Sequence, residues 1–350
     1  MAEALKKFRP YVTWANARGA WPDMVFSTRV RFARNLADLP FTGRAEPRQL
    51  DGIRRAAFTA LKETGLFPRG HFLKMESLGQ LEKGFLAERH HISHGLAFTA
   101  LPAAAVISND EDLSVMVNEE DHLRLQCLGS GFAIEETLNS ALKLDEALGR
   151  RLPYAFSGKF GFLTACPTNA GTGMRISCLA HLPAMSRLGL MPQALESLSR
   201  MGVIARGIYG EGTCVLGDYY QISNAACLGR TEEEFRVNMD RVIRNLIRQE
   251  IAARETLLKG HAKLHTEDAV FRALGVLRHA RTLSYGEFMR NISLARMGAA
   301  MGWEMGLDFS TFNQVTLLMQ PAHIQAAAGR ALSPEERDVF RADSLRKKLL

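Results

Sequence analysis

The sequence has few of the features that would tie it to a membrane, a disulfide framework or zinc. No run approaches the roughly 18 consecutive apolar residues of a membrane span, and the N-terminal residues MAEALKKFRP lack the apolar core of a signal peptide. The five cysteines are widely spaced and never form C-x-x-C, so they predict reduced thiols. We therefore expect a cytoplasmic protein.

The familiar phosphate-binding signatures are also missing. The chain contains no G-x-x-x-x-G-K-[ST] and no G-x-G-x-x-G that opens a helix after a strand. Its 44 Lys and Arg residues nevertheless exceed its 37 Asp and Glu residues, which leaves a net charge of +7. This excess favours an anionic partner such as a phosphate, a nucleotide or a nucleic acid.

The pattern of apolar residues along the 350 residues predicts a first part that contains a sheet and a second part that is helical. Apolar alternation predicts a strand over 113–118, and turn signals separate further strands over 160–164, 201–206 and 218–223. We expect these strands to form one sheet. After Thr231 apolar residues recur at spacings of three and four, which predicts a long amphipathic helix. The remainder is helical, so we place a boundary near 255–262.

Arginines offer an alternative way of holding phosphate. Arg29 and Arg31 share one face if their segment is extended, and Arg124, Arg175 and Arg206 lie near the ends of other strands. A guanidinium group stays charged and presents a planar fork to phosphate oxygens. Taken singly, however, each arginine is more often a solvated surface residue.

Carboxylates and one thiol could supply chemistry. The acidic cluster 118–122 follows a strand, Glu211 lies in a glycine-rich stretch, and Cys166 begins a segment of small polar residues and glycines. The ordinary alternatives are a polar turn, a glycine turn and a buried thiol. His90 and His122 have no partner at metal-ligand spacing, so we expect no metal site.

Four motifs in this order resemble the ATP:guanidino phosphotransferases, the family of creatine and arginine kinases. They are STRVRFARN, NEEDHLR, CPTNAGTGMR and RGIYGE, and the resemblance covers roughly residues 20–255. Within that family the chain most resembles the bacterial protein-arginine kinases. Creatine and arginine kinases place a helical domain ahead of the first motif, whereas Arg29 is near the start here. Residues 337–342, RDVFRA, also match the R-D-x-x-R-A motif that binds phosphoarginine allosterically.

The resemblance implies an α+β fold with an antiparallel sheet flanked by helices. Residues 1–258 would form the phosphotransferase domain, and residues 259–350 a small helical C-terminal domain for dimerisation and phosphoarginine binding. The chain would use ATP and Mg²⁺, with the metal held through ATP and not by a protein site.

The resemblance also implies residue roles. Glu120 would be the catalytic carboxylate, Glu211 would hold the substrate guanidinium and Cys166 would lie beside it. The allosteric site would be Arg337, Asp338 and Arg341. The residues at the ATP site would be Ser27, Thr28, Arg29, Val30, Arg31, His90, Arg124, Arg175, Ile176, Ser177, Cys178, Leu179, Arg206, Gly207, Ile208, Tyr209, Gly210 and Glu211, with His91 as an alternative to His90.

A carboxylate beside the acceptor suits the phosphorylation of a guanidinium group, which is a poor nucleophile. The pKa of a guanidinium group exceeds about 12, so its nitrogen lone pairs are engaged in resonance and protonation. A carboxylate hydrogen-bonded to the attacking nitrogen can accept the departing proton as the P–N bond forms.

The resemblance further implies partners: protein substrates with accessible arginines, an activator protein, Clp-type proteolysis and a heat-shock repressor, in a homodimer or higher oligomer. We expect no nucleic acid and no membrane partner. Two alternatives remain open. One is a small-molecule kinase that phosphorylates free arginine, and the other is a catalytically inactive basic regulator.

Overall fold

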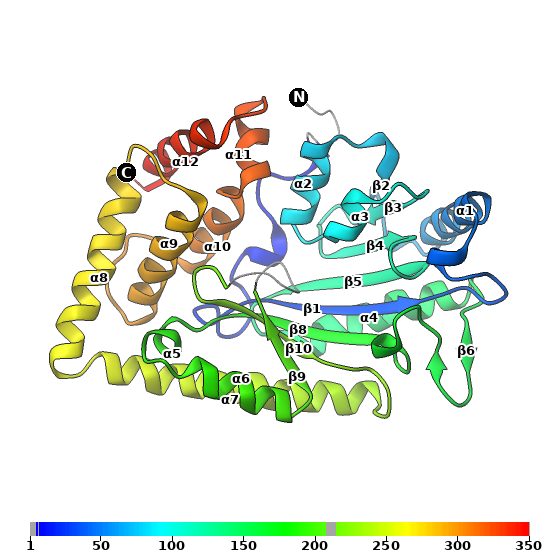
Figure 1. The fold of residues 1–350 in the computed structure, drawn as a ribbon, viewed down its shortest axis with the longest axis horizontal. Helices are drawn as coiled ribbons and strands as arrows, with labels where there is room; N and C mark the ends of the chain where they lie inside the picture. The colour runs from blue at the N-terminus through cyan, green and yellow to red at the C-terminus, as the bar shows by residue number, and fades with distance from the viewer. Residues whose placement is uncertain (1–4, 6, 208–214, 350) are drawn as a thin grey trace.

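An eight-stranded antiparallel sheet forms the centre of the molecule (Figure 1). The computed structural model describes residue 5 and residues 7–207 and 215–349. The strand order is β2-β3-β4-β5-β1-β8-β10-β9. The strands are β1 (Val25–Arg34), β2 (His71–Lys74), β3 (Ala104–Ile107), β4 (Leu113–Val117), β5 (Leu123–Ser130), β8 (Met174–His181), β9 (Val203–Arg206) and β10 (Tyr219–Asn224).

Helices surround this sheet. They are α1 (Pro47–Glu63), α2 (Gln80–Glu88), α3 (His94–Phe98), α4 (Ile134–Gly149), α5 (Pro183–Arg187), α6 (Met191–Arg200), α7 (Glu232–Leu257), α8 (Gly260–His279), α9 (Tyr285–Ala300), α10 (Phe309–Leu318), α11 (Pro321–Ala328) and α12 (Pro334–Leu349). Short 3-10 turns cover Thr13–Ala15, Thr42–Arg44, Met75–Ser77 and Pro167–Asn169. Among the described residues, no helix has both the length and the apolar character that a membrane span needs.

The two-residue period of β1 separates the core from the polar face. Val30 and Phe32 are fully buried, whereas Arg29 and Arg31 alternate with them and point to the other side. Helix α4 packs against β1 and β5 and lies behind the strands in Figure 1. The rear face of the central sheet is therefore the hydrophobic core, and the front face is left for polar side chains.

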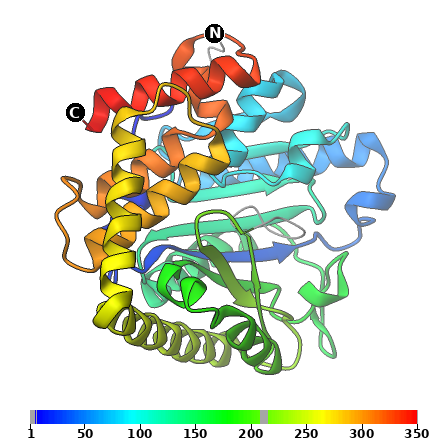
Figure 2. The ribbon, with the colours of Figure 1, turned by 60° about the vertical axis from the view of Figure 1, so that its left-hand side comes forward.

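The helices after α7 pack along one side of the sheet (Figure 2). Helix α7 ends at Leu257 and α8 begins at Gly260, so the chain turns at the predicted boundary. Helix α9 contacts α5, and α11 contacts α2. One continuous apolar cluster reaches from Val12 to Leu345, so the sheet and the C-terminal helices share a core.

The predicted strands over 113–118, 201–206 and 218–223 and the long helix after Thr231 are confirmed as β4, β9, β10 and α7. The expectation that 160–164 joins the same sheet is wrong. Only Gly161–Phe162 is a strand, β7, and it pairs with β6 (Phe156–Ser157) in a separate hairpin. The Leu163 N–H continues this hairpin by donating to the carbonyl oxygen of Ala155 at 2.9 Å. The Leu163 carbonyl oxygen and the Ala165 N–H bond to the side chains of Asn35 and Asp121 and not to a strand of the main sheet.

Arg34 joins the end of β1 to three other segments. Its guanidinium group is 1% exposed and donates to both carboxylate oxygens of Asp145 on α4, at 2.9 and 2.6 Å. It also donates to the carbonyl oxygens of Ala33 and Thr172, at 2.9 and 2.8 Å, and lies 3.5 Å from the ring centroid of Phe162. This satisfied, buried ion fixes the end of β1 against α4, the segment before β8 and the β6–β7 hairpin.

Replacing Asp145 with alanine should leave the Arg34 guanidinium buried without its counter-charge. We expect the free energy of unfolding to fall by about 3–5 kcal/mol, as measured by urea denaturation. The adjacent Glu146 forms an exposed pair with Arg150, so Glu146→Ala is a matched control that should cost less than about 1 kcal/mol. Equal losses in the two variants would contradict this role for the Arg34–Asp145 pair.

Candidate active site

Arginines from neighbouring strands meet on the front face of the sheet. In the antiparallel register Arg31 lies directly opposite Arg175 of β8, and Ala33 lies opposite Arg124 of β5. Arg29 is two residues before Arg31 and therefore projects from the same face. Directly opposed like charges destabilise a sheet, so this arrangement points to a ligand and not to a role in folding. We call Arg29, Arg31, Arg124 and Arg175 the arginine cluster.

Arg206 belongs to the same face through β10. It pairs with Gln221, whose side-chain oxygen accepts a hydrogen bond from Arg29 at 2.9 Å. The amide of Gln221 in turn donates to Ser177 at 2.9 Å. Gly207 is the last described residue after β9, and Ile208, Tyr209, Gly210 and Glu211 lie outside the described residues.

Strand alternation divides the remaining predicted ATP-site residues into two groups. Ser27, Ser177 and Leu179 lie on the arginine face, because they pair across β1 and β8 with each other or with Arg29. The side chains of the intervening residues turn to the opposite, buried face: Thr28, Val30, Ile176 and Cys178. That second group supports the strands and does not line the front face.

The arginine cluster has few acceptors of its own. The Nε atoms of Arg29, Arg31 and Arg175 are buried and have no hydrogen-bond partner among the described residues. Burial, together with the charges of Arg124 and Arg175, lowers the pKa of Arg29 to about 9. Burial and the neighbouring guanidinium groups also lower the pKa of Arg31 well below its usual value. An anion on this face would satisfy the donors and relieve the repulsion.

The acidic segment after β4 is a tightly held turn. Asn118 adopts a left-handed conformation with φ of 58°, and its backbone N–H donates to the carbonyl oxygen of His122 at 2.9 Å. Asp121 accepts hydrogen bonds from the Asn35 side chain at 2.6 Å and from the Ala165 N–H at 2.7 Å. His122 is fully buried and accepts from Leu36 N–H at 3.0 Å. These contacts fix the turn that carries Glu119 and Glu120.

The two glutamates of this turn are held differently. Glu119 accepts from Arg124 at 2.8 Å and from the Ser93 hydroxyl at 2.6 Å. Although burial opposes ionisation, Arg124 and these hydrogen bonds hold the pKa of Glu119 at about 2. Glu120 is exposed, and partial burial of its carboxylate together with Asp121 raises its pKa. Its carboxylate accepts no hydrogen bond from the described residues, so it is available to a substrate.

Sequence reasoning singled out Glu120 and missed the supporting roles of its neighbours. Glu119 orients Arg124, and Asn35 holds the turn through Asp121 and the backbone of His122. Asn35 ends the motif STRVRFARN, so its place in that motif was the available signal. Ser93 offered no signal, because its contact with Glu119 joins two segments 26 residues apart.

A small cavity lies between the arginine cluster and the segment that follows Cys166. Arg31, Arg124, Arg175, Asp121, Asn169 and Gly173 are among the residues that line it. Cys166 is half-buried, and its Sγ lies 3.0 Å from the Thr168 hydroxyl. The other described cysteines are buried. The fold therefore brings Cys166, the turn carrying Glu120 and the arginine cluster to one end of the sheet.

His90 and His91 point to different surroundings. His91 is fully buried and lies 2.8 Å from Glu111. His90 adopts φ of 60° and packs edge-on to Trp14. Burial and the nearby charge of Arg29 lower the pKa of His90 to about 3. His90 is thus the histidine on the side of the arginine cluster, and it is neutral at physiological pH.

The two arginines of the C-terminal motif differ in burial and in hydrogen bonding. Arg341 is 1% exposed and donates to the carbonyl oxygens of Met319 at 2.9 Å and Leu283 at 2.7 Å, and to Asp338 at 2.7 Å. Arg337 is half-buried, and its guanidinium group forms no hydrogen bond with the described residues. Arg341 therefore ties α12 to the loops before α9 and α11, while Arg337 keeps its donors free.

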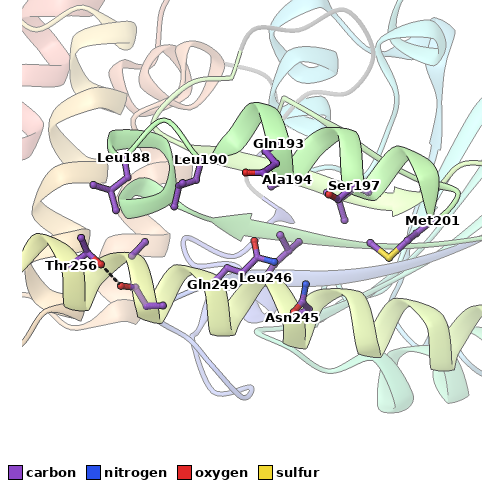
Figure 3. A pocket seen from close by; sticks show the side chains of 13 residues that line it. Leu188, Leu190, Gln193, Ala194, Ser197, Met201, Asn245, Leu246, Gln249 and Thr256 are labelled. Atoms are coloured by element: carbon purple, nitrogen blue, oxygen red, sulfur yellow. Dashed lines mark hydrogen bonds between the residues drawn. The ribbon is translucent and has the colours of Figure 1, made fainter.

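A separate groove runs between α6 and α7 (Figure 3). Leu190, Ala194, Leu246 and Gln249 are among its walls, and no residue that lines it carries a charge. None of the predicted site residues lies there. A groove without charge cannot neutralise a phosphate group, so the arginine cluster remains the candidate active site. Among the described residues no group of His, Cys, Asp and Glu could hold a metal ion.

Two family models together match most of the chain. A model of the ATP:guanido phosphotransferase C-terminal catalytic domain matches residues 53–253. A model of the protein-arginine kinase McsB C-terminal domain matches residues 263–350. The first model covers every strand of the main sheet except β1, which carries Arg29 and Arg31, and it ends within α7. The second covers the C-terminal helices from α8 onward.

Individual relatives are similar to this chain over almost its whole length. The protein-arginine kinase of Symbiobacterium thermophilum is 42% identical over 339 residues, which are 96% of each chain. The protein-arginine kinase of Halothermothrix orenii is 38% identical over 336 residues, again 96% of each chain.

Solved structures resemble the catalytic part. The duplicated taurocyamine kinase of Schistosoma mansoni with transition-state-analog components aligns with a TM-score of 0.62 and 25% identity, over 69% of this chain and 35% of that one. A lombricine kinase aligns with a TM-score of 0.58 and 23% identity, over 70% of this chain and 72% of that one. The fold is that of guanidino kinases.

Replacing Arg31 with methionine should stabilise the protein and remove its response to polyphosphate. Less repulsion in the arginine cluster should raise the ligand-free unfolding free energy by about 0.5–2 kcal/mol. In the parent protein, ATP or tripolyphosphate at 100 times its Kd should add about 2.7 kcal/mol, and in the variant this gain should largely vanish. Thermal unfolding with and without ligand measures both effects.

Arg241→Met on the exposed side of α7 is the control, and it should change neither quantity. A ligand-free Arg31→Met protein that is less stable than the parent would show that the cluster contributes to folding.

Proposed function

Because this chain belongs to the ATP:guanido phosphotransferase family, we propose that it is a protein-arginine kinase, which transfers the γ-phosphoryl group of ATP to arginine side chains of proteins. The observation that carries this proposal is the pairing of an arginine cluster short of acceptors with a rigid turn that presents Glu120. The cluster suits a polyphosphate, and the carboxylate suits a cationic nucleophile.

The residues present fit ATP. Arg29, Arg31, Arg124, Arg175 and Arg206 would bind phosphate oxygens, and the buried Nε atoms without partners are donors that such oxygens would satisfy. Glu119 keeps Arg124 in place and, with its low pKa, stays ionised. Mg²⁺ would be held by ATP oxygens and water, with no cage of described carboxylates, and would neutralise charge on the phosphates.

The carboxylate of Glu120 would act on the acceptor. It would accept a proton from the attacking guanidinium nitrogen while that nitrogen forms a bond to the γ-phosphorus and the bond to the ADP oxygen breaks. Partial burial and Asp121 raise its pKa, which makes it a better proton acceptor than an ordinary surface glutamate. Glu211, as the second carboxylate, and Cys166, beside the guanidinium, complete the proposed acceptor site.

Protein arginine is the acceptor best supported. Both relatives described above are named protein-arginine kinases and match 96% of this chain, and the C-terminal helices match the corresponding model. Free arginine as acceptor has no such support. An inactive regulator is disfavoured because the arginine cluster and Glu120 are assembled as catalysis requires.

The same proposal extends to regulation and partners. Arg337, Asp338 and Arg341 would form the phosphoarginine site, with Arg337 as the residue whose donors are free to bind the phosphoryl group. A dimer through the C-terminal helices, an activator protein, a Clp-type unfoldase, a heat-shock repressor and a cytoplasmic location belong to this proposal, and the C-terminal model is what supports it.

Glu120→Gln keeps the shape of the side chain and removes the proton acceptor. We expect kcat for arginine phosphorylation to fall by about 10²-fold or more, while ATP binding survives. Because the pKa of Glu120 is raised, the parent rate should be lost, as pH falls, at a higher pH than the value of about 4.3 typical of glutamate.

Phosphoarginine formation, followed by mass spectrometry at neutral pH, measures the rate. The comparison variant Glu119→Gln loses the partner of Arg124 and should weaken ATP binding instead. Near-parental turnover by Glu120→Gln would remove Glu120 from the catalytic role.

Arg337→Ala should weaken phosphoarginine binding tenfold or more, since a charge-assisted bond is lost. It should change stability little, because the Arg337 guanidinium group forms no hydrogen bond with the described residues. Arg341→Ala should lower the melting temperature, because the carbonyls of Leu283 and Met319 lose their donor. Calorimetric titration and thermal unfolding separate the two effects. Arg330→Ala, an exposed arginine before α12, is the control. Undiminished binding by Arg337→Ala would refute the site.

A further inference from the structure

Helix α2 ends in a turn that has a histidine at a position where glycine is usual. The His90 N–H donates to the carbonyl oxygen of Ala87 at 2.9 Å, and the His91 N–H donates to that of Leu86 at 3.0 Å. This pair of hydrogen bonds closes many helices, and the residue in the place of His90 is then left-handed and usually glycine. His90 adopts that conformation, with φ of 60°, although its Cβ makes it unfavourable. Such strained residues persist only where the surrounding structure holds them, and they are frequent at functional sites.

The backbone of His90 lies on the arginine face of the sheet. Its carbonyl oxygen accepts a hydrogen bond from the Gln126 side chain at 2.6 Å. Gln126 of β5 lies directly opposite Arg31 of β1, so the two side chains project from the same face. On the other side of Arg31 lies Arg175 of β8. His90 therefore borders the arginine cluster on the β5 side.

The two residues before His90 attach this turn to the C-terminal helices. Glu88, the last residue of α2, accepts hydrogen bonds from the N–H groups of Ala322 and His323, at 2.7 and 3.0 Å, and so caps the N-terminus of α11. Arg89 donates from its Nε atom to the Nε2 atom of His323 at 3.1 Å. Figure 1 shows α11 beside α2, and the two helices are in contact. The turn that carries His90 is therefore fastened to α11 by both of the residues that precede it.

His323 links the side chains of Glu88 and Arg89. An arginine offers only donors, so the Nε2 atom of His323 accepts from Arg89. The proton of the neutral ring is then on Nδ1, which donates to Glu88 at 2.7 Å. Burial lowers the pKa of His323, which favours this neutral form. The other two nitrogens of the Arg89 guanidinium group donate to Glu111 at 2.7 Å and to the Arg9 carbonyl oxygen at 2.9 Å. Arg89 is 2% exposed, so this buried network fixes the residue directly before His90.

We propose that Arg89 and His323 are positioning residues for the nucleotide, because they hold His90 in its left-handed conformation beside the arginine cluster. This inference rests on the proposed function, in which the arginine cluster binds the ATP phosphates and His90 contacts the nucleotide. The arginines would bind a polyphosphate whether or not a nucleoside is attached to it. A ring at the border of the cluster would instead contact the part of ATP that extends beyond the phosphates. His323 would thereby connect the C-terminal helices to the recognition of the nucleoside.

The test compares ATP with inorganic tripolyphosphate, which has the phosphates and lacks the nucleoside. Two variants separate the two hydrogen bonds of His323. His323→Asn places an amide near the former Nδ1 atom, so it keeps the bond to Glu88 and is too short to reach Arg89. His323→Gln places an amide near the former Nε2 atom, so it keeps the bond to Arg89. Calorimetric titration of the full chain measures the Kd of each ligand.

For His323→Asn we expect the Kd of ATP to rise about tenfold, the scale of one lost hydrogen bond. The Kd of tripolyphosphate should change less than about twofold, which also shows that the variant is folded. His323→Gln should bind both ligands within about twofold of the parent, because the bond that holds Arg89 is kept.

His90→Gly tests whether the effect passes through His90. Glycine adopts the left-handed conformation without strain, so this variant keeps the turn and lacks the ring. It should also lose affinity for ATP and not for tripolyphosphate. Adding His323→Asn to His90→Gly should cause no further loss, because the residue that His323 positions is already gone.

An equal rise of both Kd values in His323→Asn, or no rise for ATP, would overturn the positioning role while leaving the kinase proposal intact. A further loss of ATP affinity in the double variant would overturn it as well. A parent protein that shows the expected binding pattern but phosphorylates no arginine would refute the kinase proposal and support the positioning role. A parent protein that binds neither ligand would refute both.

Discussion

Mutual repulsion among the guanidinium groups on one face of the sheet is the constraint around which this molecule is built. Arg31 directly opposes Arg175, and the pKa values of both are lowered by burial and by neighbouring positive charge. Such a face is tolerable only on a sheet whose other face is firmly packed. The buried residues Val30 and Phe32, with α4 behind them, supply that packing.

The turn that carries Glu119 and Glu120 places negative charge beside the arginine face of the sheet. The two adjacent glutamates on this turn have pKa values shifted in opposite directions. Arg124 lowers the pKa of Glu119, whereas partial burial and then Asp121 raise the pKa of Glu120. Glu119 is thereby committed to Arg124, and in the proposed mechanism Glu120 is left for the acceptor. On the proposed mechanism, two residues joined by one peptide bond would then serve charge neutralisation and proton transfer separately.

Much of this arrangement could be predicted from the sequence, because the signals are local. Alternation predicts which residues of β1 face the core, and the spacing of three and four predicts α7. The hairpin containing Gly161 leaves the main sheet because of a backbone contact with Gly171, which no periodicity reveals. Which of His90 and His91 lies on the side of the arginine cluster depends on the left-handed backbone conformation of His90. The spacing of side chains along the sequence does not predict that conformation. Contacts over long separations, such as that of Arg34 with Asp145, have no local signature.

Residue type alone does not distinguish a structural arginine from a ligand-binding one, but an account of hydrogen bonds does. Arg31 and Arg34 lie on the same strand. Arg34 is satisfied by a carboxylate, two carbonyl oxygens and an aromatic ring, whereas the described residues offer Arg31 no acceptor. The C-terminal motif shows a similar contrast: Arg341 is fully engaged, whereas the Arg337 guanidinium group forms no hydrogen bond with the described residues. A buried donor without an acceptor destabilises the folded protein. A buried guanidinium group without an acceptor, such as that of Arg31, therefore indicates a site where a ligand would supply the acceptor. A guanidinium group whose hydrogen bonds are all made within the protein, such as that of Arg34, stabilises the fold.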